Sequence, residues 1–224
     1  MSLRRRPVET PPDLLVGYKL AHLMLASDGS RAEFGGVSLG AHRPYGPIAD
    51  ASCVFSRRHR PPNPFCDCGF YCLHSADAAR AVGCDGRYRG AVLLEVVVSG
   101  RFIRYDHGLR YARQRVRAVR VGLCGCGRRA DAMADSGWGQ VGWRRLVPVC
   151  AWCAGQRPRA SFDRLTALLD GRVPVTSDDA AAPIDAPQPV RADERVAVLT
   201  AEVALLQARL DDVQTRLRNV GDPG

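Results

Sequence analysis

Lysine is almost absent from this chain of 224 residues, which has one lysine, Lys19, against 31 arginines. Long apolar runs are absent as well. The longest, residues 91–98, spans eight residues, whereas a membrane-spanning helix needs about 20. The segment 1–13 holds three arginines and three prolines in place of the apolar stretch of a signal peptide. We therefore expect a cytoplasmic protein without membrane association.

Acidic residues are scarce in the segment 1–160, which holds 12 Asp and Glu against 25 Lys and Arg. The rest of the chain holds 11 acidic and 7 basic residues, so the formal net charge of +9 originates in the N-terminal part. A basic body of this kind attracts nucleic acid, acidic proteins or anionic membranes. A GC-rich genome explains arginine in place of lysine, but not the excess over acidic residues.

The nine cysteines are concentrated in short motifs. In a reducing compartment, clustered thiols ligate metal more often than they form disulfides. One set pairs Cys-x-Cys with Cys-x2-Cys, and the other combines three cysteines with a histidine. Zinc prefers tetrahedral sites of this composition, so the sequence predicts two Zn²⁺ ions per chain. The predicted ligands are Cys124, Cys126, Cys150 and Cys153 in one site, and Cys53, His59, Cys66 and Cys68 in the other.

Other roles for the thiols stay open. The first set could form buried pairs in an ordinary core, or Cys150 and Cys153 could act as a redox dithiol. Cys72 and Cys84 could replace a ligand or form a separate pair, although the aromatic pair before Cys72 favours a core thiol. Both sites look closed, and an HExxH signature is missing, so we expect structural zinc. A thiol or zinc enzyme is the minor alternative.

The hydrophobic pattern predicts a mainly β fold, a zinc-stapled β-meander with a few short helices. A Ser-Asp-Gly turn at 27–29 predicts a hairpin, and Ser99-Gly100 predicts a break between two strands. Strands are expected at residues 14–25, 91–98, 101–105 and 109–123, and helices capped by Ser75 and Ser161 are expected at 76–82 and 162–169.

Composition divides the chain into four parts. These are a disordered N-terminus at 1–13, a basic body at 14–170 with sub-modules 14–121 and 122–160, a Pro- and Ala-rich linker at 171–192, and a coiled coil at 193–220.

The spacing between successive apolar residues is alternately three and four positions, which predicts a coiled coil. We therefore expect the chain to be a homo-oligomer. The alternative is a helix that packs on its own body. The apolar positions are Val196, Leu199, Val203, Leu206, Leu210, Val213, Leu217 and Val220.

Alternating arginines on one predicted strand place several guanidinium groups on one face, where they could bind phosphate. The competing interpretation is a solvated face of a half-exposed sheet. The candidate nucleic-acid-binding residues are Arg113, Arg115, Arg117, Arg128 and Arg129.

Three further motifs carry a resemblance. They are GYKLA at 17–21, Cys53 followed by HRPPNPFCDCGFY at 59–71, and RGAVLLEVVVSG followed by HGLRYARQRV at 107–116. Together they resemble a small uncharacterised zinc-binding family of actinobacteria and their phages, over about half of the chain. The resemblance implies that Cys53, His59, Cys66 and Cys68 act as one unit, and it implies no activity.

The sequence thus favours a non-enzymatic accessory or regulatory protein that associates with nucleic acid and oligomerises through its coiled coil. The alternative is an adaptor whose zinc modules bind an acidic protein partner without nucleic acid.

Overall fold

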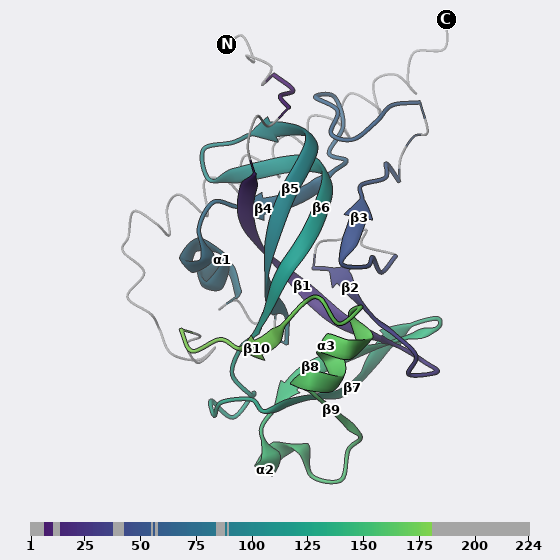
Figure 1. Cartoon of the computed structure of the whole chain (residues 1–224), viewed down its shortest axis with the longest axis vertical. Coiled ribbons are helices and arrows are strands. Elements are labelled where there is room, and N and C mark those ends of the chain that lie inside the picture. The colour runs from purple at the N-terminus through teal and green to yellow at the C-terminus, as the bar shows by residue number, and fades with distance from the viewer. Residues whose placement is uncertain are drawn as a thin grey trace, which may run out of the picture. The chain divides into compact units, whose positions relative to one another are not determined.

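An antiparallel sheet runs through the part of the chain that the computed structural model describes, residues 7–10, 14–37, 43–54, 56, 58–83, 88 and 90–180 (Figure 1). The mainly β prediction is confirmed. In chain order the elements are β1 (Leu15–Ala26), β2 (Ala32–Gly36), β3 (Ile48–Asp50), β4 (Phe70–Leu73), α1 (Ala76–Gly83), β5 (Val92–Arg104), β6 (Gly108–Val121), β7 (Ala132–Gln140), β8 (Trp143–Val149), α2 (Ala151–Ala154), β9 (Arg159–Ser161), α3 (Phe162–Leu168) and β10 (Val175–Ser177).

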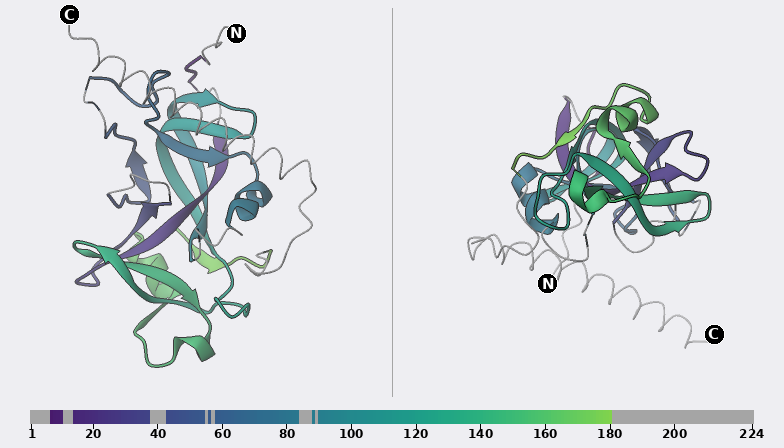
Figure 2. Two further views of the ribbon diagram at one scale, coloured as in Figure 1. Left: turned by 180° about the vertical axis from the view of Figure 1, so that it is seen from behind. Right: turned by 90° about the horizontal axis from the view of Figure 1, so that it is seen from below.

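Four strands close into a ring, because β1 pairs with β5, β5 with β6, β6 with β4, and β4 with β1. The simple meander is therefore only part of the topology. β1 also pairs with β2 and, near its end, with β8, which joins the ring to the β7–β8 hairpin. At that junction the Ser27 N–H donates a hydrogen bond to the carbonyl of Gly142, and the ends of the two hairpins lie side by side (Figure 2).

The β5–β6 hairpin is longer than the sequence predicted, because β5 continues through Ser99 and Gly100. The register shifts between Ser99 and Phe102, which is a β-bulge, and Gly100 has a φ of 71° there. Only glycine adopts that conformation at low cost, so the residue bends the strand without ending it. The predicted break at this point is wrong.

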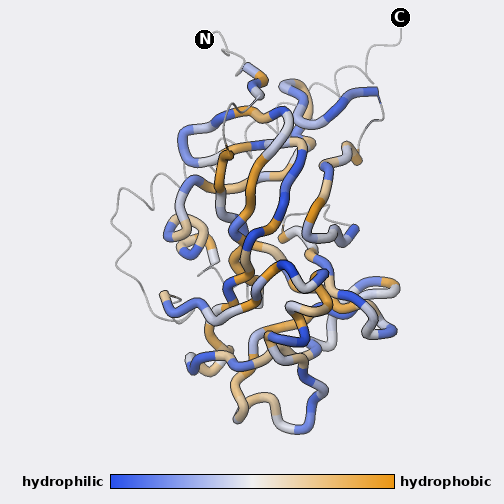
Figure 3. Tube along the Cα trace, viewed as in Figure 1, coloured by the Kyte–Doolittle hydropathy of each residue, from blue (hydrophilic) through white to orange (hydrophobic). Residues whose placement is uncertain are grey.

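The core fills the ring and the face that β1 shares with β8. Leu94, Val96, Phe102 and Tyr111 are almost fully buried inside it. Figure 3 shows apolar stretches along the strands, interrupted by hydrophilic stretches such as the one along β6. Burial of each such side chain contributes about 1.5–3 kcal/mol, so the core is large enough to hold the sheet together.

Both predicted helix caps are confirmed. The hydroxyl of Ser75 accepts a hydrogen bond from the Ala78 N–H, and that of Ser161 accepts one from the Arg164 N–H. The first cap begins α1, which packs beside β1 and β5. The second begins α3, which packs beside β9 and β10 (Figures 1 and 2).

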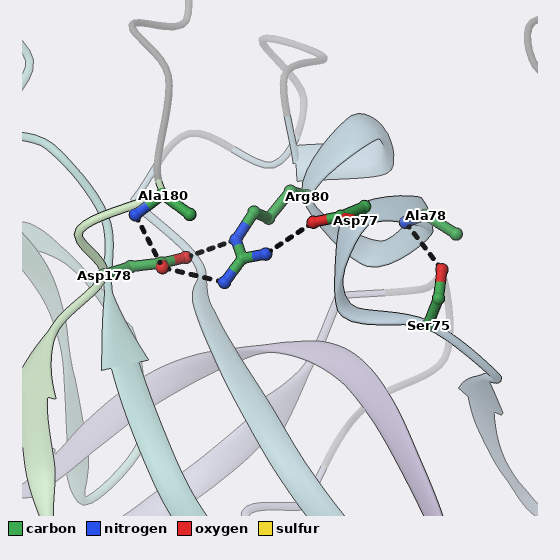
Figure 4. A network of polar contacts seen from close by, with 6 residues as sticks. All are labelled: Ser75, Asp77, Ala78, Arg80, Asp178 and Ala180. Carbon is green, nitrogen blue, oxygen red and sulfur yellow. Dashed lines mark hydrogen bonds and ion pairs between the residues drawn. The ribbon is translucent and has the colours of Figure 1, made fainter.

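Residues 171–180, which the sequence assigned to a linker, belong to the body. β10 pairs in parallel with β6, and Val173 and Val175 are buried. The carboxylate of Asp178 is 6% exposed and binds Arg80 of α1 through two contacts of 2.8 and 2.9 Å (Figure 4). The composition of residues 171–180 gave no indication of a three-residue strand. This part of the linker prediction is therefore wrong.

A second correction concerns the N-terminus. Glu9 forms an antiparallel bridge with Phe102, in which each residue donates its N–H to the carbonyl of the other. Disorder throughout residues 1–13 is therefore ruled out. The predicted coiled coil at 193–220 and the rest of the linker lie outside the described residues. None of the helices in the described ranges is long and apolar enough to cross a membrane.

Candidate metal centres

The first centre forms where two segments meet on one edge of β6. Cys53 follows β3, which pairs with β6, while Cys66 and Cys68 lie just before β4, which pairs with the same strand. His59 lies on the loop between them. Their ligand atoms all lie within 4.8 Å of one another, so the structure brings together all four predicted ligands.

Interatomic distances in this centre fit a metal ion. The Sγ atoms of Cys53 and Cys66 are 3.7 Å apart, and Nε2 of His59 is 3.3 Å from Sγ of Cys68. A tetrahedral ion with Zn–S bonds of about 2.3 Å separates two sulfurs by about 3.8 Å, and a shorter Zn–N bond gives a shorter edge. A disulfide needs about 2.05 Å, so the thiols are arranged for a shared ion.

Arg110 of β6 anchors the loop that carries this centre. Its side chain is 4% exposed, and its guanidinium donates to the backbone carbonyls of Cys66 and Asn63, the latter at 3.1 Å. The rings of Tyr71 and Tyr105 lie within about 6 Å of the same group. A buried cation thus orients the backbone on either side of the first Cys-x-Cys ligand.

The loop also requires a glycine after its second cysteine. Gly69 has a φ of 132°, and a Cβ there would lie 2.9 Å from Cγ of Arg110. The Cys-x-Cys-Gly motif therefore has a physical reason: the chain turns tightly into β4 while the arginine passes directly beside it.

The second centre joins the turn after β6 to the short helix α2. Sγ of Cys126 lies 3.7 Å from Sγ of Cys150, and the four ligand atoms again lie within 4.8 Å of one another. Cys150 caps α2, because its sulfur accepts the N–H of Cys153 at 3.5 Å. The β7–β8 hairpin connects the two cysteine pairs.

Burial and hydrogen bonds set different acidities for the thiols. Burial raises the pKa of Cys68 to about 12, and hydrogen bonds among the sulfurs raise that of Cys153 to about 12. The hydrogen bond from the Cys153 N–H lowers the pKa of Cys150 to about 6. A cysteine binds a metal ion as its thiolate, so a metal ion would displace protons from Cys68 and Cys153 at neutral pH.

Two cysteines lie outside these sets. Cys72 is 5% exposed and faces Gly17 across the ring, and burial raises its pKa to about 12. It is a core thiol, as the sequence favoured. Cys84 lies outside the described residues.

The arginine row on β6 alternates as predicted, with Arg113, Arg115 and Arg117 exposed. Two of the three have carboxylate partners. Arg113 forms a two-contact ion pair with Asp50 of β3 at 2.7 and 2.8 Å, and Arg117 lies 3.3 Å from Glu95. The first pair holds β3 beside β6, so part of the row stabilises the sheet that carries Cys53.

The other two candidate arginines lie by the second centre. Arg128 places its guanidinium 5.8 Å from the ring centre of Trp152, and Arg129 pairs with Asp179 at 3.1 Å. The sequence did not single out Trp152 or Arg110. The signal for Trp152 was its place between two ligands in Cys-x2-Cys, whereas Arg110 gave none, because its partners lie far from it in the sequence.

Comparison of the chain with protein-family models, curated proteins and solved structures gives no match. The geometry of the two centres therefore carries the functional argument.

Proposed function

We propose that this protein is a non-enzymatic, zinc-binding accessory protein that binds nucleic acid and oligomerises through the coiled coil predicted at 193–220. The observation that carries the proposal is the completeness of both centres. Each has four ligand atoms within 4.8 Å of one another, two of its sulfurs 3.7 Å apart, and a composition that suits Zn²⁺. At each centre, the four side chains named above would hold one ion.

Closed centres favour a structural role. A catalytic zinc keeps a position for water or substrate beside three protein ligands, whereas each set here supplies four. When bound, the ions supply a rigid crosslink between distant segments, and structural zinc sites contribute on the order of 10 kcal/mol to folding. In the first centre the crosslink joins the segment after β3 to the segment before β4, and in the second it joins the turn after β6 to α2.

Charge supports nucleic acid as the partner. The segment 1–160 has about twice as many basic as acidic side chains. Arg113 pairs with Asp50, and Arg117 pairs with Glu95. These ion pairs leave less positive charge on the β6 arginines for binding phosphate. Arg115 and Arg128 have no acidic partner within the described ranges, so we place the remaining phosphate contacts with these residues.

Titration of labelled oligonucleotides with the metal-loaded full chain tests this function. We expect binding that weakens steeply as salt increases, because arginines that contact phosphates release counterions. Binding should be lost when a strong chelator removes the metal. The nucleic-acid proposal is refuted if the metal-loaded protein binds no oligonucleotide at low salt.

A protein–protein adaptor is the second candidate, and the first centre favours it. Val54 and Phe65 lie on its loops and are 68% and 71% exposed, which is unusual for apolar side chains held on a rigid scaffold. Affinity capture with and without nuclease separates the two candidates. One stoichiometric protein partner that survives nuclease would favour the adaptor.

A further inference from the structure

A tryptophan in the second centre is exposed without an evident structural reason. Trp152 is 82% exposed, although it lies on α2 between the ligands Cys150 and Cys153. Its backbone is fixed on both sides, while its ring extends into solvent. Exposing an indole ring of this size forfeits about 2 kcal/mol of burial, and the two flanking cysteines fix its place at the surface.

Arg128 accompanies the ring. Its guanidinium lies 5.8 Å from the ring centre, and its backbone carbonyl accepts the N–H of Cys124 at 2.8 Å. Arg157 contacts the C-terminal end of the helix by donating to the carbonyl of Cys153 at 2.9 Å. The ring thus lies on α2 and the guanidinium on the turn after β6. A metal ion bound by cysteines of both segments would fix the position of one relative to the other.

The charges around this pair are mostly positive. Residues 122–160 contain six arginines and two aspartates. One of the aspartates, Asp131, accepts the N–H of Ala151 at 2.9 Å, and the other, Asp135, lies along β7 near Arg144. Across the described ranges no carboxylate contacts Arg128. An anionic group beside the ring would therefore meet a free guanidinium.

A single aromatic platform of this kind fits a nucleobase better than a protein surface. Protein interfaces place an exposed tryptophan at the centre of a wider apolar patch. The other large exposed apolar side chains of residues 122–160 are Trp138 and Val141, at the far end of β7, and six residues of strand separate Trp138 from Ala132 by about 20 Å. Stacking of one base needs only one ring, and its phosphate needs a cation beside it.

We propose that Trp152 and Arg128 form a stacking platform for single-stranded nucleic acid, in which a base stacks on the indole and the adjoining phosphate binds the guanidinium. This inference rests on the nucleic-acid part of the proposed function and names its site. A duplex keeps its bases stacked internally, so the platform selects unpaired nucleotides.

The test uses metal-loaded full-length protein and fluorescein-labelled single-stranded and duplex oligonucleotides of mixed sequence, read by fluorescence anisotropy. We expect tighter binding to the single strand. Trp152→Ala should weaken that binding about 5- to 100-fold, the range for the loss of one stacked base, while Trp152→Phe should retain most of it. Arg128→Gln should weaken binding and lower its salt dependence.

Trp138→Ala is the matched control, since Trp138 is also exposed, at 78%, but lies at the hairpin end. It should bind like the wild type. Metal content and thermal unfolding of each variant show that both centres remain intact. In a Trp138→Phe/Trp143→Phe background, the remaining Trp152 emission should be quenched by the single strand.

Each contrary outcome has a distinct meaning. If the wild type binds nucleic acid and Trp152→Ala binds equally well, the platform is wrong while the proposed function stands. If the metal-loaded wild type binds neither single strand nor duplex, both fail. If Trp152→Ala abolishes capture of an acidic protein but the wild type binds no oligonucleotide, the occupant is a protein and the inference is overturned.

Discussion

Replacing Arg110 with methionine tests whether the buried guanidinium holds the first centre in shape. Methionine keeps most of the aliphatic stem and removes the donors to the carbonyls of Cys66 and Asn63. A buried acceptor left without a partner costs about 1–3 kcal/mol. Because the loop is half-buried, the low end of that range applies to each carbonyl. The two together give a loss of about 2 kcal/mol, or about 30-fold in metal affinity.

Chelator competition measures this effect, with the second centre as an internal reference. One of the two metal equivalents should be released at about 30-fold lower chelator concentration, while the other is unchanged. Cobalt substituted at the first centre should show altered visible absorption bands, because its ligand geometry relaxes. Arg110→Lys keeps the charge and one donor, and should recover part of the affinity. Unchanged release of both equivalents, or equal weakening of both, would refute the reasoning.

Three further predictions concern the body. Asp178→Ala leaves Arg80 with a single exposed partner and should lower the free energy of unfolding by about 2 kcal/mol in urea titrations, whereas no change would refute this contribution of the ion pair. Burial lowers the pKa of His22 from its ordinary 6.5 to about 4, so the unfolded state binds the proton first and stability falls as pH decreases through that window. His22→Gln should flatten this decrease relative to the wild type. Gly17→Ala places a Cβ 2.3 Å from Sγ of Cys72 and should destabilise the fold by about 1–3 kcal/mol, with less effect in a Cys72→Ala background.

The candidate ligands of both centres were predictable because the sequence spacing of their cysteines is typical of metal sites. Cys-x-Cys and Cys-x2-Cys place two sulfurs on one turn, so the sequence alone indicates which thiols could share an ion. The loop of His59 has no periodic pattern, yet Nε2 of His59 lies 3.3 Å from Sγ of Cys68. The mainly β fold, the first hairpin and both helix caps followed from similarly local signals.

Features that depend on distant contacts were not predictable. Arg110 looked like one more arginine of a basic strand, and its partners at Asn63 and Cys66 are determined by the pairing of β4 with β6. β10 is three residues long and follows Pro174, so composition outweighed the alternation of Val173 and Val175. The ion pair between Arg113 and Asp50 was not predictable for the same reason, because the two residues come from strands far apart in sequence.

The most direct test of the central claim is native mass spectrometry of the full chain purified without chelator. The account predicts two zinc ions per chain, and one zinc ion fewer in each of the variants Cys66→Ser and Cys126→Ser, because these residues belong to different centres. A metal-free wild-type chain that remains folded would contradict it, as would a single variant that loses both ions while the fold is retained.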